Sequence, residues 1–219
     1  MSYQANLRVW RGDDDGGDLR DYQVDVNEGE VVLDIVHRLQ AEQTPDLAVR
    51  WNCKAGKCGS CSAEINGRPR LMCMTRMSTF DPAETVTITP LRTFPVIRDL
   101  VTDVSFNYEK ARQIPSFAPP KDLQPGEYRM AQEDVERSQE FRKCIECFLC
   151  NNVCHTIRDH EENKKNFAGP RYLRLCHSFP CVFFRFSLCA FRWYFFYLAP
   201  DFENHLNARS TKNKRFFAC

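Results

Sequence analysis

The chain has 219 residues, with 30 Lys or Arg and 29 Asp or Glu, so its net charge at pH 7 is +1. This balance indicates neither a nucleic-acid-binding surface nor a polyacidic tail. Hydrophobic residues make up 43% of the chain, which is enough for a globular core, and the length suits one large or two small domains.

The unusual feature of the composition is its 12 cysteines, which can indicate disulfides, zinc sites or iron–sulfur clusters. Residues 1–17 are polar and acidic and contain no apolar segment typical of a secretion signal. Acidic residues between 13 and 18 also argue against a transit peptide, which avoids them. We therefore expect reduced thiols in a cytoplasmic setting, which favours metal binding over a disulfide framework.

The first hundred residues have the patterns of a small α+β domain. Several short segments alternate apolar and polar residues, as half-buried strands do. One segment has apolar residues at 32, 35, 36 and 39, which is a helical spacing. The predicted elements are strands over 6–11, 21–26, 62–65, 70–74 and 85–89, a hairpin loop over 12–18, a helix over 31–43 and a tight turn at Asn66-Gly67.

Residues 91–130 have the composition of a connector. Four prolines between 115 and 125 predict an extended segment that is poor in helix. From Ala131 the pattern becomes helical, with acidic residues such as Glu133 in the first turns and Arg142 and Lys143 near the end, as the helix dipole prefers.

The last segment, 172–219, differs in kind from the rest of the chain. It contains no glycine, few acidic residues and a dense run of aromatic side chains. Its stretch 182–199 is nearly long enough to cross a bilayer. However, Arg185 and Arg192 interrupt that stretch, and each costs about 2.5–3.5 kcal/mol near the centre of a membrane helix.

The first set of cysteines has the spacing C-x4-C-x2-C-x11-C and consists of Cys53, Cys58, Cys61 and Cys73. This is the spacing of plant-type [2Fe–2S] ferredoxins, in which soft, anionic thiolates hold the irons. Gly56 and Gly59 let the backbone approach a cluster, and their N–H groups can donate to its sulfurs. Zinc and unbound buried cysteines are the alternatives, although zinc sites usually use separate C-x2–4-C pairs.

The second set has the spacing C-x2-C-x2-C-x3-C and consists of Cys144, Cys147, Cys150 and Cys154. This is the run found in bacterial ferredoxins, whose fourth cysteine serves a different cluster in two-cluster proteins. The run normally ends in Cys-Pro, whereas here His155 follows. Zinc is again the alternative. We interpret the remaining cysteines as ordinary thiols, because no second run accompanies them: Cys176, Cys181, Cys189 and Cys219.

The pairing of these two cysteine runs resembles the iron–sulfur (B) subunit of succinate dehydrogenase and fumarate reductase. The resemblance covers about residues 1–175. Its motifs are WNCKAGKCGSC at 51–61, LMCMT at 71–75, FPVIRDLV at 94–101, CIECFLCNNVC at 144–154 and RDHEENKKNFAGPRYL at 158–173.

The resemblance implies a β-grasp plant-type ferredoxin domain over 1–105, a proline-rich connector over 106–130 and a truncated or altered α-helical bacterial-ferredoxin-like region over 131–175. It implies [2Fe–2S], [4Fe–4S] and [3Fe–4S] clusters that relay electrons between the flavin of a partner A subunit and a quinone held by membrane anchor subunits. The protein would then lie peripherally at the cytoplasmic face of the cell membrane. It would have no catalytic residue and no nucleic-acid partner.

Residue by residue, the first four cysteines match the [2Fe–2S] ligands. Cys144, Cys147 and Cys150 match [4Fe–4S] ligands, and Cys154 matches a [3Fe–4S] ligand. His155 occupies a position at which relatives contact quinone, although an ordinary surface histidine is an equal alternative, and the usual Pro, Ser and Trp pattern is absent here.

The chain departs from the family pattern after about Leu173, where the remaining ligands of the second and third clusters would be expected. We interpret the tail over 176–219 as a frameshifted reading of the gene, with a hydrophobic membrane tail as the rival. Two other functions stay open: a defective subunit that carries only the [2Fe–2S] cluster, and a structural zinc-binding interaction protein.

Overall fold

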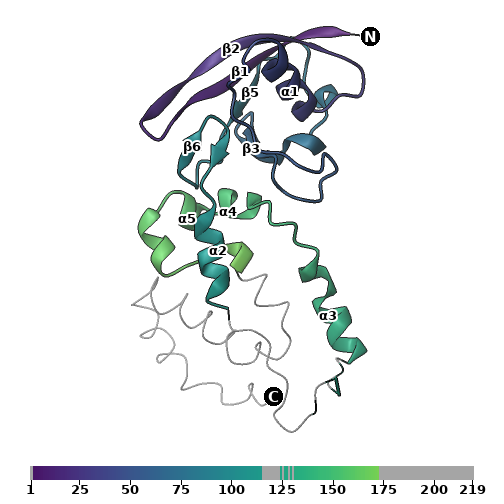
Figure 1. Cartoon of the computed structure of the whole chain (residues 1–219), viewed down its shortest axis with the longest axis vertical. Coiled ribbons are helices and arrows are strands. Elements are labelled where there is room, and N and C mark those ends of the chain that lie inside the picture. Colours follow the sequence, from purple (N-terminus) through teal and green to yellow (C-terminus); the bar gives the residue numbers. More distant parts are fainter. Residues whose placement is uncertain (1, 115–123, 125, 128, 130, 173–219) are drawn as a thin grey trace, which may run out of the picture. The chain divides into compact units, whose positions relative to one another are not determined.

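The computed structural model describes residues 2–114, 124, 126–127, 129 and 131–172 (Figure 1). The chain divides into two compact units, of which the first comprises Met1–Ser116 and Arg129–Ser178 and holds almost all of these residues. In the second unit, the backbone N–H of Glu127 donates to the Gln124 carbonyl at 3.0 Å, which forms a turn.

Several predictions fall outside the described residues. They include most of the proline-rich segment, the hydrophobic stretch 182–199 and the four cysteines of the tail, namely Cys176, Cys181, Cys189 and Cys219.

Seven strands of the first unit form one sheet: β1 (Tyr3–Asp13), β2 (Gly16–Val26), β3 (Ser62–Ile65), β4 (Arg68–Leu71), β5 (Val86–Thr89), β6 (Val96–Arg98) and β7 (Val101–Thr102). Their order is β4-β3-β5-β1-β6-β7, and β2 pairs with β1. β1 and β5 are parallel neighbours, which requires a long crossover between them. That crossover contains the first helix and the whole first set of cysteines.

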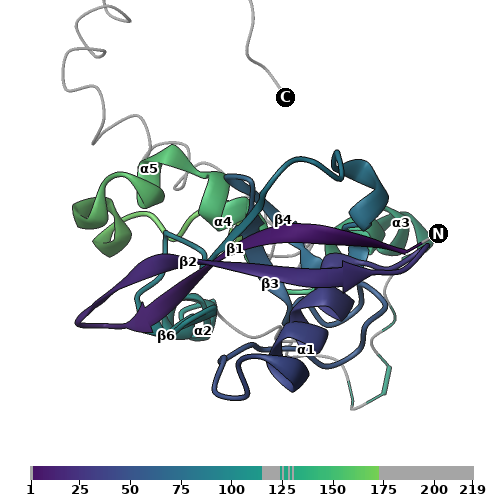
Figure 2. The same cartoon turned by 90° about the horizontal axis from the view of Figure 1, so that it is seen from above.

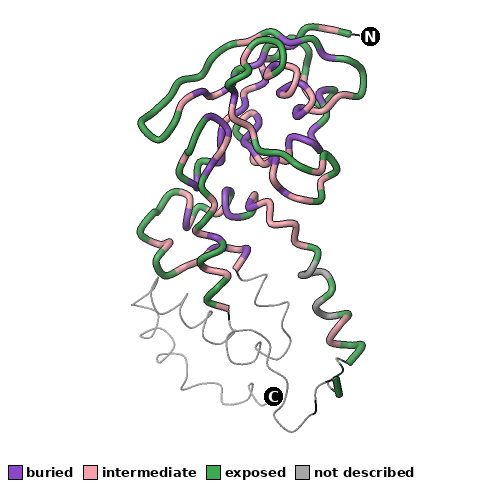
Figure 3. Tube along the Cα trace, in the orientation of Figure 1, coloured by how far each residue is buried: buried purple, intermediate pink, exposed green. Residues whose placement is uncertain are grey.

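Helix α1 (Val32–Glu42) packs on one face of this sheet (Figure 2). Its large apolar side chains point into the core, where Leu33, Ile35 and Leu39 are fully buried. They meet inward-facing strand residues such as Leu7 and Ile88, which are also fully buried. Figure 3 shows these buried positions concentrated between the strands and α1. The predicted helix is confirmed, because its 3.6-residue apolar spacing matches a single buried face.

The β1–β2 hairpin is longer than predicted. Residues 12–18 were expected to form its loop, but pairing continues through Gly12↔Gly17 to Asp13↔Gly16, so only two residues turn the chain. The glycines explain the extension, because a Cβ at Gly12 would lie 2.3 Å from the Gly16 carbonyl oxygen. The acidic residues beside these glycines therefore lie in a paired hairpin and its two-residue turn, not in an open loop.

The predicted strand over 70–74 is wrong at its C-terminal end. β4 ends at Leu71, and Met72–Met74 form a 3-10 turn. The expected tight turn at Asn66-Gly67 is confirmed, since both residues have positive φ, 48° and 71°. The 3-10 turn buries Cys73 to 6% exposure, on the core side of the neighbouring cysteine loop.

The first part of the stretch 91–130 forms regular secondary structure, whereas a connector was expected. It contains the β6–β7 hairpin and α2 (Ser105–Arg112), neither of which was predicted. The hairpin turns at Asp99, which has a φ of 47° and whose carboxylate accepts the backbone N–H groups of Gly12 and Ala48. These contacts come from residues distant in sequence, so local patterns do not indicate them.

The helical part of the first unit follows. The predicted helix after Ala131 is confirmed as α3, and short helices surround the second set of cysteines. Within the described ranges, no helix is long and apolar enough to cross a membrane. The elements are α3 (Gln132–Arg142), α4 (Leu149–Val153), α5 (His155–Arg158) and the 3-10 segment Glu161–Lys165.

A buried ion pair joins β1 to the β6–β7 turn. Arg11 Nε donates to Asp99 Oδ1 at 2.9 Å, and the two side chains are only 8% and 3% exposed. Although burial alone would lower the pKa of Arg11, its hydrogen bonds to Asp99, Tyr22 and Asp46 raise that pKa overall. The buried charge of Arg11 is therefore compensated mainly by Asp99, with Asp46 as a second, exposed partner.

We expect Asp99→Ala to lower the free energy of unfolding by about 3 kcal/mol, because it leaves a buried guanidinium and two backbone N–H groups without their acceptor. Denaturant titration of the purified chain measures this loss. The matched control is Asp21→Ala, which removes the exposed Arg8–Asp21 pair and should change stability little. Equal losses in the two variants would contradict the structural role given to Asp99.

Candidate iron–sulfur site

The first four cysteines meet at the end of the domain where α1, the loop before β3 and the 3-10 turn after β4 converge. Cys53 and Cys58 belong to the loop, Cys61 directly precedes β3, and Cys73 lies in the 3-10 turn. The backbone N–H of Met72 donates to the Cys61 carbonyl at 3.0 Å, which fixes the turn against the loop. All four thiols are free.

These thiols interact mainly in two pairs. The sulfur of Cys58 interacts with Cys53, and the sulfur of Cys61 interacts with Cys73 and, more weakly, with Cys58. Among the described residues, no three cysteine sulfurs lie within 4.8 Å of one another. Two pairs of thiols match the four thiolates and two irons of a [2Fe–2S] centre.

The loop turns its backbone N–H groups towards the first pair. Those of Ala55 and Lys57 donate to Cys53 Sγ at 3.4 and 3.3 Å. Lys54 and Gly56 have φ values of 52° and 64°, a left-handed geometry that makes this concave arrangement possible. The predicted donation from the glycine N–H groups to cluster sulfurs stays a prediction.

The two pairs differ in their electrostatic surroundings. The hydroxyl and backbone N–H of Ser60 hydrogen-bond to Cys58 and, with Cys53, lower the pKa of Cys58 to about 6. Burial raises the pKa of Cys61 to about 12. Cys61 is 3% exposed, whereas Cys58 is half-buried. Cys58 therefore carries negative charge readily, and the inner pair is screened from water.

A lysine of the cysteine loop contacts the neighbouring helix. The ammonium of Lys54 lies 3.5 Å from Asp34 Oδ1 and 5.3 Å from the centre of the Trp51 ring. Trp51 in turn packs edge-on against His37, with ring centres 4.7 Å apart. Lys54 therefore links the cysteine loop to α1, in addition to any effect on the charge of the site.

The second set of cysteines runs from the segment before α4 to the end of that helix, with Cys150 in its first turn. The pKa of Cys150 is raised by desolvation and, to a smaller extent, by the neighbouring Cys147 and Cys144. Cys154 lies between α4 and α5. His155 is exposed at the first position of α5.

Buried polar residues that sequence reasoning missed anchor this second set. Asn152 donates to Glu64 Oε1 of β3 at 2.6 Å and accepts the Thr93 N–H at 3.1 Å. Asn151 donates to Asn107 Oδ1 of α2 at 2.6 Å. Both asparagines are fully buried, although Asn is a poor helix former. In the sequence, the two adjacent asparagines between Cys150 and Cys154 are the signal that could have indicated their structural role.

A buried arginine supports the ligand loop from the other side. Arg171 pairs with Glu146 and its guanidinium lies 5.2 Å from the centre of the Phe148 ring. Glu146 and Phe148 have left-handed φ values of 56° and 58°, which a non-glycine residue adopts only at a cost. Arg171 contacts both strained residues and so stabilises the conformation that gathers the thiols.

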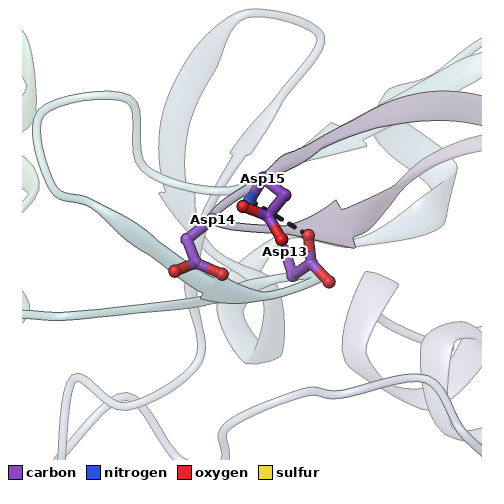
Figure 4. Close-up of side chains that lie close together, drawn as sticks. All are labelled: Asp13, Asp14 and Asp15. Carbon is purple, nitrogen blue, oxygen red and sulfur yellow. Dashed lines mark hydrogen bonds between the residues drawn. The ribbon is translucent and has the colours of Figure 1, made fainter.

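The exposed acidic tip of the β1–β2 hairpin is a separate feature (Figure 4). One carboxylate oxygen from each of Asp13, Asp14 and Asp15 lies within 4.8 Å of the others, and the Asp15 N–H donates to Asp13 Oδ1 at 3.1 Å. Exposed acidic groups are common at turns, and these three do not contribute to either cysteine site.

Comparisons with known proteins agree with this geometry. Residues 6–109 match the family described as the 2Fe-2S iron-sulfur cluster binding domain. A solved structure, the Mycobacterium smegmatis Sdh1 complex in the apo form, contains a chain that is 82% identical, with a TM-score of 0.79 over 81% of this chain and 75% of that one. The chain belongs to the succinate dehydrogenase and fumarate reductase iron–sulfur subunit family.

Two curated relatives are more distant. The fumarate reductase iron-sulfur subunit of Mycobacterium tuberculosis is 35% identical over 61% of this chain and 55% of its own length. The succinate dehydrogenase [ubiquinone] iron-sulfur subunit 1, mitochondrial, of Oryza sativa is 34% identical over 71% of this chain and 55% of its own length. The chain thus spans about half the length of these relatives.

The predicted family and the order of its parts, a β-grasp [2Fe–2S] domain followed by a helical region, are confirmed. The truncation or alteration of the helical region stays a prediction.

In the metal-free chain, we expect iodoacetamide to alkylate Cys58 faster than Cys61 at pH 7. The thiolate is the nucleophile, and the lowered pKa of Cys58 keeps it ionised above about pH 6, whereas Cys61 remains protonated and buried. Mass spectrometry of labelled peptides measures the two rates.

Lowering the pH through about 6 should slow the reaction of Cys58. Ser60→Ala should slow it at pH 7, because the variant loses the hydroxyl donor that lowers the pKa. Equal rates for the two cysteines, or no effect of Ser60→Ala, would contradict this assignment.

Proposed function

We propose that this protein is the electron-transfer iron–sulfur subunit of a succinate dehydrogenase or fumarate reductase complex. In this role it relays electrons between the flavin of a partner A subunit and membrane quinone. The observation that carries the proposal is the pairing of four thiols in a domain of the [2Fe–2S] family, with a second cysteine loop anchored directly on that domain. The chain then acts at the cytoplasmic face of the membrane, through anchor subunits.

The first site fits the proposed group through its donor chemistry. When bound, a [2Fe–2S] cluster supplies one-electron redox chemistry. The N–H groups of Ala55 and Lys57 and the hydroxyl of Ser60 stabilise negative charge on the outer thiol pair. Burial of the inner pair excludes water from the core side. The proposed ligands are Cys53, Cys58, Cys61 and Cys73.

The second and third sites follow from the helical region over 131–175. Cys144, Cys147 and Cys150 are the proposed [4Fe–4S] ligands, and Cys154 is the proposed [3Fe–4S] ligand. Their placement supports this division, because Cys144 and Cys147 precede α4, Cys150 lies in its first turn and Cys154 follows its last residue. His155 is a proposed quinone contact, supported by its exposure beside Cys154.

A second candidate function is a subunit that builds only the [2Fe–2S] cluster. One observation favours it: among the described residues, the second site brings together only three thiols, whereas a cubane has four irons. The connector over 106–130 and the tail over 176–219 complete the proposed division of the chain. A structural zinc role has less support, because the first thiols form two pairs.

We expect the purified native protein to be coloured and to contain iron, with a dithionite-reduced electron paramagnetic resonance signal from the first cluster. Cys73→Ser should remove that signal, whereas Cys154→Ser should leave it intact. Iron analysis separates the candidates, because about two irons per chain indicate only the first cluster and about nine indicate the full relay. A colourless, zinc-loaded protein would overturn both.

A further inference from the structure

Gly59 is the point at which the two cysteine loops touch. It lies between Cys58 and Cys61 of the first set, with a φ of 71°. A Cβ built on it would lie 2.7 Å from three backbone atoms of the second loop: the Cα and N of Cys147 and the carbonyl oxygen of Ile145. Normal contacts at that distance do not occur, so only glycine allows this approach.

A hydroxyl bridges the same two backbones. Ser62 Oγ lies 2.8 Å from the Gly59 carbonyl oxygen and 2.9 Å from the Cys147 carbonyl oxygen. A serine hydroxyl has one hydrogen, so it donates to one of these carbonyls at a time and keeps them together. The contact therefore has both a steric component at Gly59 and a polar component at Ser62.

The second tie between the loops lies two residues along β3. Glu64 is 3% exposed and accepts from Asn152 at 2.6 Å while Arg92 binds its two oxygens at 2.8 and 2.6 Å. Because Asn152 follows Cys150 in α4, the second cysteine loop is held at both its start and its end. The size of the side chain at position 59 therefore mainly sets the distance between the second loop and the first loop.

We propose that Gly59 is a positioning residue that sets the separation of the two iron–sulfur sites. The absent side chain allows the backbone of the first ligand loop to lie directly on the backbone of Cys147, one of the ligands of the second site. This inference rests on the proposed function, since it assigns a second cluster to Cys144, Cys147 and Cys150. Any side chain at position 59 meets backbone atoms, which cannot rotate away, so the loops must move apart.

The chain offers a matched control at Gly67. This glycine forms the turn between β3 and β4, outside both cysteine loops, and has the same φ of 71° as Gly59. Alanine there imposes the same left-handed strain. Its Cβ would meet no atom within 4 Å, so Gly67→Ala imposes the strain without pushing the two loops apart.

The experiment compares Gly59→Ala, Gly67→Ala and the wild-type protein, all purified with their native clusters. We expect Gly59→Ala to keep the first cluster's visible absorption, to lose iron from the second site and to weaken the spin–spin broadening between the reduced clusters. Gly67→Ala should retain the iron content and the broadening of the wild type. Unchanged broadening and iron content in Gly59→Ala, or equal losses in Gly67→Ala, would overturn the proposal.

Hydrogen–deuterium exchange separates this inference from the proposed function. If the wild type carries only the first cluster, the proposed relay fails, but exchange of amides 144–154 still reports how the second loop is held. Faster exchange in Gly59→Ala than in Gly67→Ala supports the positioning role, and equal exchange contradicts it. If Gly59→Ala does not fold, Ser62→Ala takes its place in the experiment. We then expect faster exchange of amides 144–154 in Ser62→Ala than in the wild type. Unchanged exchange would contradict the positioning role.

Discussion

The joining of the two cysteine loops depends on the hydrogen bonds that the buried carboxylate of Glu64 accepts. Glu64 lies on β3, directly after the first ligand loop, and accepts hydrogen bonds from Arg92 and from Asn152 of α4. Burial alone would raise the pKa of Glu64, but these hydrogen bonds lower it overall, so the carboxylate stays charged inside the protein. A buried charge is tolerated only where it is compensated, and here the compensation comes partly from the second cysteine run.

This arrangement makes the second loop an extension of the β-grasp domain. Asn151 and Asn152 place α4 against α2 and β3, and Arg171 supports the strained residues between the cysteines. None of these contacts requires a bound cluster. The conformation of the second cysteine loop is therefore held by ordinary hydrogen bonds and packing.

The first site shows a related division between exposed and buried ligands. The outer pair, Cys53 and Cys58, receives backbone and hydroxyl donors, whereas the inner pair, Cys61 and Cys73, is buried against the core. Donors and burial act in opposite directions on thiol ionisation. Charge at the site therefore concentrates on its solvent side.

The sequence by itself determined the family and the main elements of the first domain, and its cysteine spacing predicts the two ligand sets. These depend on short-range patterns, such as the spacing from Cys53 to Cys61 and the apolar stripe of α1, which local geometry reads directly. The tertiary structure decided how the thiols pair, because Cys73 reaches Cys61 only after the chain turns at Met72–Met74. It also decided the β6–β7 hairpin at Asp99 and the contact of Gly59 with Cys147. Each of these joins residues far apart in sequence, so the packing of whole elements, and not local spacing, brings them together.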